Sequence, residues 1–82
     1  MKVRVQVMLR PDMLDPQGKA IANALAALGF SGIGEVRQGK LIELELTDDD
    51  PAHAREQAEA MCKQLLANPV IEDYAIEIIP SG

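Results

Sequence analysis

Residues 2–9 read KVRVQVML, and this stretch decides the fold. Apolar residues occupy its odd positions, whereas most of its even positions carry polar or charged side chains. Such alternation predicts a β-strand with one face toward a core and one face toward solvent. Pro11 ends the pattern.

The segment after this strand carries the signals of a helix start. Asp15 is a good N-cap residue and Pro16 suits the first helical position. Apolar residues then recur at helical spacing, and Gly29 suits the end of the helix. We therefore predict a helix from about residue 16 to 28, with one apolar stripe formed by Ile21, Ala24, Leu25 and Leu28.

Two further strands are predicted in the middle of the chain. Residues 29–34 form a glycine-rich turn, and residues 33–38 are predicted to form a short second strand. Gly39-Lys40 is predicted as a hairpin turn. In the third strand, Ile42, Leu44 and Leu46 alternate with polar residues.

A second helix and a last strand complete the pattern. Asp50 is predicted to cap the helix, with Pro51 in its first turn and Asn68-Pro69 at its end. The last strand is predicted over about residues 71–79, and residues 80–82 are expected to fray. The apolar stripe of this helix consists of Ala54, Ala58, Met61, Cys62, Leu65 and Leu66.

The order βαββαβ predicts an α+β fold, a two-layer sandwich with two helices on one face of an antiparallel sheet. We expect one domain over residues 1–82 and the ferredoxin-like strand order 4-1-3-2. Charges agree with this order, because cations on the first strand would face carboxylates on both neighbours. These residues are Lys2 and Arg4 on the first strand, Glu43 and Glu45 on one neighbour, and Asp73 and Glu77 on the other.

Size and composition limit the function. A chain of 82 residues gives a marginally stable domain, and its single cysteine, Cys62, rules out an internal disulfide or a cysteine-rich zinc site. Self-association is the remaining way to stabilise such a small domain, so a homo-oligomer is expected. No signal peptide or membrane span is visible, so we expect a soluble cytoplasmic protein. A net charge of −5 and only two aromatic residues argue against nucleic-acid binding.

No catalytic, cofactor-binding or metal-binding residue is predicted. His53 is the only histidine and is expected to face solvent on a helix, while Cys62 belongs to an apolar stripe and is expected in the core. The acidic run 48–50 fits helix capping better than a calcium loop. The glycines at 29–34 match neither a phosphate loop nor a dinucleotide fingerprint.

Two βαββαβ alternatives remain open. An acylphosphatase-like enzyme would need an anion cradle in residues 10–16, where two prolines remove donors and two aspartates repel anions. A dimeric sensor of amino acids would need a polar pocket, and Asp12 with Asp15 could hold a ligand amine.

Three segments resemble one known family, in order and spacing: residues 14–20 (LDPQGKA), 36–40 (VRQGK) and 65–74 (LLANPVIEDY). Together they resemble the PurS family, the small subunit of phosphoribosylformylglycinamidine (FGAM) synthase, over about residues 3–79. Asp12 stands where the family often has glycine, and Leu41 where it often has an aromatic residue; these two differences affect loop shape and packing.

The resemblance implies a subunit without chemistry of its own. It would act as a homodimer or a tetramer between a synthetase subunit that uses ATP and magnesium and a glutaminase subunit, in de novo purine biosynthesis. Holding two active sites together would favour ammonia transfer by raising effective concentration. The predicted contact residues are Arg37, Gly39, Lys40, Asn68, Glu72 and Asp73.

Overall fold

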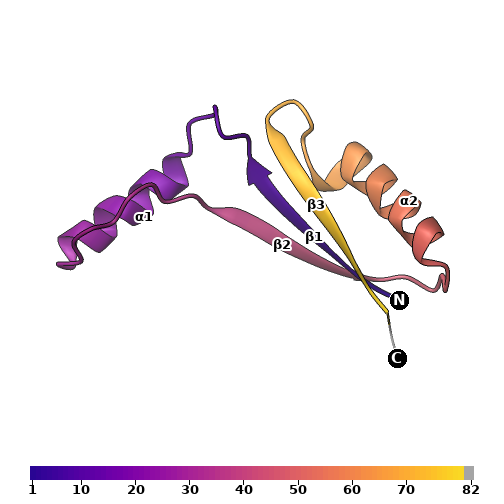
Figure 1. The fold of residues 1–82 in the computed structure, drawn as a ribbon. Helices are drawn as coiled ribbons and strands as arrows, with labels where there is room; N and C mark the ends of the chain where they lie inside the picture. The colour runs from indigo at the N-terminus through magenta and orange to yellow at the C-terminus, as the bar shows by residue number, and fades with distance from the viewer. Residues whose placement is uncertain (81–82) are drawn as a thin grey trace.

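The computed structural model describes residues 1–80 and contains one antiparallel sheet, two α-helices and one π-helical turn (Figure 1). The expected fraying of residues 80–82 falls largely outside the described residues. In chain order the elements are β1 (Lys2–Leu9), α1 (Pro16–Ala27), β2 (Gly39–Glu45), α2 (Pro51–Met61), the π turn η1 (Cys62–Leu66) and β3 (Glu72–Ile79).

The sheet places β1 in the centre, with the order β2-β1-β3 and antiparallel pairing on both sides. The predicted α+β class and antiparallel sheet are confirmed. The observed order agrees with the predicted one for these three strands, because the prediction placed the first strand between the last strand and the strand of residues 42–46. Val5, in the middle of β1, lies opposite Ile42 of β2 and Ile76 of β3.

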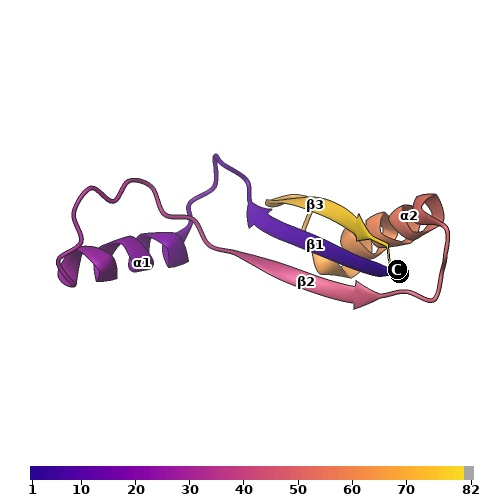
Figure 2. The ribbon, with the colours of Figure 1, turned by 60° about the horizontal axis from the view of Figure 1, so that its bottom comes forward.

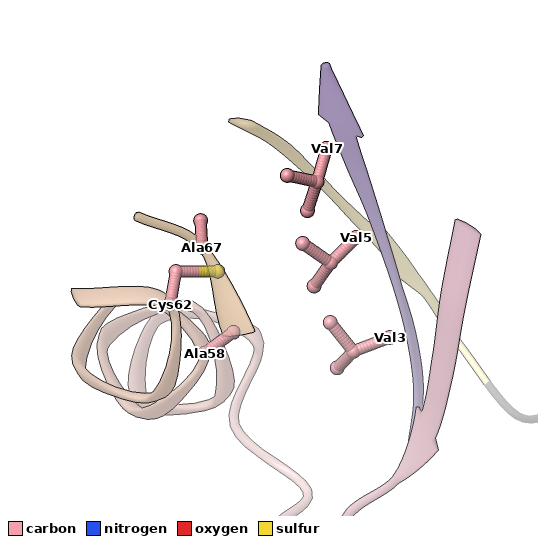
Figure 3. Close-up of a cluster of buried hydrophobic side chains, with 6 residues drawn as sticks. All are labelled: Val3, Val5, Val7, Ala58, Cys62 and Ala67. Atoms are coloured by element: carbon pink, nitrogen blue, oxygen red, sulfur yellow. The ribbon is translucent and has the colours of Figure 1, made fainter. Parts of the chain in front are cut away.

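The core lies between β1 and α2. Val3, Val5 and Val7 point from β1 toward the helix and are at most 1% exposed (Figure 3). Ala58 and Cys62 oppose them, and their small side chains let the helix approach the sheet closely. The predicted core position of Cys62 is confirmed.

The end of the second helix differs from the prediction. The chain passes into the π turn η1, which the Ala67 amide closes by donating to the Cys62 carbonyl at 3.0 Å. A π-helical turn contains more residues than an α-helical turn, so the side chains in and after it point in different directions from those that an α-helix would give them. Leu65, predicted in the core stripe, is therefore 83% exposed, whereas Ala67 is buried.

Residues 33–38 do not form the predicted second strand, and Gly39-Lys40 is not a hairpin turn. Both glycine and lysine already belong to β2, where Gly39 lies opposite Met8 and Lys40 opposite Val7. Residues 33–38 therefore extend beyond the end of β1, where no neighbouring strand is available for pairing.

The helix α1 does not cover the sheet within one chain. Together with residues 28–38 it projects past the end of β1, and we call residues 10–38 the arm (Figures 1 and 2). The radius of gyration is 16.2 Å, compared with about 12 Å expected for a compact chain of this length. Within residues 1–80, the sheet is covered by α2 and the following turn η1, on the face that carries the β1 valines.

Candidate subunit-contact site

The root of the arm is held by one carboxylate. Asp15 caps α1, where its Oδ1 accepts from the Gly18 amide at 2.9 Å. Its Oδ2 accepts from the Gln38 amide at 2.9 Å, so the same side chain also ties down the returning chain. These backbone hydrogen bonds, first from Gly18 and then from Gln38, lower the pKa of Asp15.

Two backbone contacts complete this joint. A Cβ on Gly18 would lie 2.1 Å from the Val36 carbonyl oxygen, so only glycine lets α1 pack against the returning segment. The Arg37 guanidinium donates to the carbonyl oxygen of Leu9, at the end of β1. The arm is therefore fixed to the sheet at a defined angle. We call Asp15, Gly18, Val36, Arg37 and Gln38 the joint.

Within the arm, α1 has two apolar stripes rather than one. The first, with Gly18, Ala22 and Leu25, is buried or half-buried on the side of the returning segment, and Ala22 lines a groove of about 270 Å³ with residues 34–36. The second stripe, with Ile21, Ala24 and Leu28, is exposed. Leu28 is 74% exposed.

The sheet has a matching uncovered area. The helix α2 packs against β1 and β3. On the same face of the sheet, β2 carries Ile42 and Leu44, which remain only partly buried. Lys40 lies on this face too, at the end of the strand. One chain thus has an unpartnered apolar helix and a partly covered apolar strand.

Several of the predicted contact residues have structural roles within the chain. Arg37 belongs to the joint. Gly39 leaves room for Met8, because a Cβ there would lie 2.1 Å from the Met8 Sδ atom. Lys40 is exposed and makes no side-chain hydrogen bond or ion pair to the described residues 1–80.

The other predicted contact residues shape the turn before β3. The Asn68 amide donates to Glu72 Oε1 at 2.7 Å, and Asn68 Oδ1 accepts from the Val70 amide at 3.1 Å. Asp73 pairs with Arg10 at 3.6 Å. The predicted residues lie around the end of β1. Gly39 and Asp73 lie on either side of Met8, and Lys40 lies opposite Val7. Glu72 lies opposite Leu9, whose carbonyl oxygen accepts from Arg37, and Asn68 joins the group through its hydrogen bond with Glu72.

The face of the sheet opposite α2 carries the predicted charge pairs. Arg4 lies between Glu43, at 3.1 Å, and Glu77, at 3.5 Å, while Lys2 reaches Glu43 at 3.7 Å. The predicted pairing of β1 cations with carboxylates on both neighbours is confirmed for these residues. Asp73 differs, because it pairs with Arg10 from the loop beyond β1.

The structure assigns structural roles to the reactive side chains. His53 is exposed on α2, and its ring contacts Asp48, which raises the pKa of His53. Burial raises the pKa of the Cys62 thiol, which opposes thiolate formation. Asp50 caps α2 as predicted, by accepting from the Ala52 amide at 3.0 Å. In residues 1–80, no three histidine, cysteine or acidic side chains gather as a metal site would require.

The loop considered for a ligand amine is already occupied by backbone contacts. Both carboxylate oxygens of Asp15 accept amide hydrogens of the chain itself, which leaves Asp12 as the only other acid in the loop. This arrangement disfavours the amino-acid sensor.

Sequence reasoning named Gly18 and Gln38 only as members of the segments that resemble the family, and gave neither a role in placing α1. Glycine has a lower helix propensity than most residues, so Gly18 within the helix was a signal of a close backbone approach.

Comparison with known proteins decides the family. The family model of PurS, described as phosphoribosylformylglycinamidine (FGAM) synthase, matches residues 2–80. The chain belongs to the PurS family. The PurS subunit of FGAM synthase from Mycobacterium leprae is 56% identical over 72 residues, which cover 88% of this chain and 87% of the relative. The subunit from Synechocystis sp. is 52% identical over 75 residues, covering 92% and 75%.

Solved PurS structures share the fold. The crystal structure of Methanocaldococcus jannaschii PurS, a subunit of the amidotransferase in the purine biosynthetic pathway, matches with a TM-score of 0.91 at 38% identity, covering 99% of this chain and 98% of that one. A chain in the structure of PurLQS from Thermotoga maritima matches with a TM-score of 0.86 at 31% identity, covering 95% of each. This PurS chain is thus a member of a family of FGAM synthase subunits. None of the helices in residues 1–80 is long and apolar enough to cross a membrane.

Proposed function

We propose that this chain is a non-catalytic PurS subunit that works as a homodimer and holds the glutaminase and synthetase subunits of FGAM synthase together. The observation that carries the proposal is the match to PurS over residues 2–80, including the PurS chain of a PurLQS structure. In this role ATP and magnesium are used by the synthetase subunit, and the complex works in the cytoplasm.

The absence of gathered chemistry supports a scaffold role. The reactive side chains of residues 1–80 are either buried, as Cys62 is, or used in helix capping and local pairing, as Asp50 and His53 are. Ammonia released by a glutaminase protonates and diffuses away in water. A subunit that keeps both active sites together raises the effective concentration of ammonia at the second site.

The surface area supports the homodimer. The chain exposes 5824 Å², whereas a folded monomer of this mass is expected to expose about 4,800 Å². The excess of about 1,000 Å² is close to the ~800 Å² that each partner contributes to a standard interface.

The shape of the arm indicates how two copies would join. The exposed stripe with Ile21, Ala24 and Leu28 would pack on the apolar face of the partner's β2, which carries Ile42 and Leu44. A two-fold axis would repeat the same contact with the roles exchanged. Each sheet would then carry its own α2 and the partner's α1, which restores the two-layer sandwich.

The six predicted contact residues remain proposed contacts with the partner subunits. Lys40 is the foremost of them, because the other five already have a role within the chain. Arg37, Gly39, Asn68, Glu72 and Asp73 would act mainly by shaping the backbone around the contact.

The test is the formation of FGAM by the matching synthetase and glutaminase subunits, with and without this chain, supplied with either glutamine or an ammonium salt. We expect glutamine-driven synthesis to require the chain and ammonia-driven synthesis to proceed without it. If neither rate depends on the chain, and it does not co-elute with the other subunits, the proposed function is wrong.

A further inference from the structure

The face of the sheet opposite α2 contains a hollow of about 320 Å³, at the centre of the three strands. Its floor is the row in which Gln6 lies opposite Leu41 on β2 and Ala75 on β3. The side chain of Ala75 is small, so it leaves open space above the sheet at this position. Leu41 is 56% exposed, and it gives the floor an apolar side.

The rim of the hollow is formed by the next row, where Arg4 lies between Glu43 and Glu77. Arg4 contacts both carboxylates, at 3.1 and 3.5 Å, and so holds them in place beside the hollow. Glu43 also pairs with Lys2 at 3.7 Å, and both carboxylates keep accessible surface, with side chains 45% and 63% exposed. Groups that are already ordered lose less entropy when a partner binds.

Carboxylates outnumber cations on this face. The charged residues on the outward positions of the strands are Lys2, Arg4, Glu43, Glu45, Asp73 and Glu77. The excess of negative charge persists when Arg10, which pairs with Asp73 from beyond the strand, is included. The face therefore suits a partner that brings positive charge.

We propose that this hollow is a docking site for an arginine or lysine side chain on one of the two larger subunits of the complex. Such a side chain has an apolar stem and a charged head. The stem would lie over Leu41 and Ala75, and the head would pair with Glu43 and Glu77. The site extends the proposed function, on which it rests, because the homodimer uses the opposite face and leaves this one free.

The decisive variant is Ala75→Arg, which supplies the docking group from within the chain. Its stem fills the hollow and its head pairs with the two rim carboxylates. We expect at least about a tenfold loss of affinity for one larger subunit, measured by titration of the purified synthetase and glutaminase subunits. The matched control is Ala60→Arg, at an exposed position of α2, which adds the same side chain and should leave the affinity within about twofold.

A second variant tests the charge without filling the hollow. Glu43→Gln combined with Glu77→Gln should weaken the same interaction by about three- to tenfold and flatten its dependence on salt concentration. The control pair is Glu56→Gln with Glu59→Gln on α2, which makes the same change in net charge away from the sheet. The first variant fills the hollow and the second only removes charge. If Ala75→Arg does not fold, the double variant alone still tests the docking site.

The outcomes separate this inference from the function on which it rests. Failure of the unmodified chain to bind either larger subunit overturns the proposed function and the docking site together. Binding of the unmodified chain, with both sheet variants binding as tightly as their controls, overturns the docking site alone. A selective loss of affinity in the sheet variants, with the homodimer intact, supports the site.

Discussion

The exposed leucine at the end of α1 gives the sharpest test of the proposed homodimer. In the single chain Leu28 is 74% exposed, so Leu28→Ser would change the stability of a monomer very little. In the proposed homodimer, by contrast, Leu28 would lie on the stripe that packs on the partner's sheet. The same substitution would therefore remove a buried contact twice, once in each half of the two-fold interface.

The expected loss of dimer stability follows from the exposed fraction of the Leu28 side chain. Complete burial of a leucine contributes about 1.5–3 kcal/mol, so burial of the exposed three-quarters contributes about 1–2 kcal/mol. Two copies give about 2–4 kcal/mol per dimer. At 1.4 kcal/mol for each factor of ten, the dissociation constant of the dimer should rise by about 30- to 700-fold.

Sedimentation equilibrium over a range of concentrations measures this constant directly. The control is Leu65→Ser, because Leu65 is 83% exposed but lies on η1, away from the arm. We expect the control to dimerise like the unmodified chain. Equal dissociation constants for both variants, or a monomeric unmodified chain at micromolar concentration, would refute the proposed use of α1.

Three further predictions concern the fold. Gly18→Ala should destabilise the chain by about 1–3 kcal/mol in urea unfolding, because its Cβ would meet a carbonyl oxygen 2.1 Å away; Gly34→Ala, with open space around its Cβ, should be nearly neutral. Val5→Ala should cost about 2 kcal/mol and lower the Tm by about 8–16 °C in calorimetry, because the side chain is fully buried; an unchanged Tm would contradict this core. His53 should titrate above its ordinary value of 6.5 in nuclear magnetic resonance spectra, and Asp48→Asn should return it toward that value. Because the folded pKa is raised, the pair's stabilisation is present below pH 6.5 and is lost as the pH rises through the folded pKa.

The sequence predicted the three strands that form the sheet, although not the absence of the fourth, because local patterns in those strands agree with one another. Alternation in β1 identified the strand and its buried face, and the positions of the charges indicated its neighbours. Arg4, predicted to lie between carboxylates, contacts Glu43 and Glu77. The starts of both helices were also predictable, because Asp15 and Asp50 cap them through their own side chains.

The arm was not predictable from the same kind of pattern. An amphipathic helix indicates that one face must be covered, but it does not say whether the cover comes from the same chain. The position of α1 depends instead on the joint, where the Gln38 amide donates a hydrogen bond to Asp15, a residue 23 positions earlier in the sequence. The sequence also could not separate proposed partner contacts from local roles. Arg37 and Asn68 have side chains that suit a partner surface, but in the structure they hydrogen-bond to the chain's own backbone.

The joint also explains why the two apolar surfaces of one chain would remain apart. Asp15 and Gly18 hold α1 against the returning segment, and Arg37 anchors that segment at the end of β1. A chain this short is only marginally stable alone, and its arm is held away from the strand that it would cover. In the proposed homodimer, folding of the arm and association of the subunits therefore depend on each other, so that loosening the joint should weaken the dimer even though no joint residue needs to touch the partner.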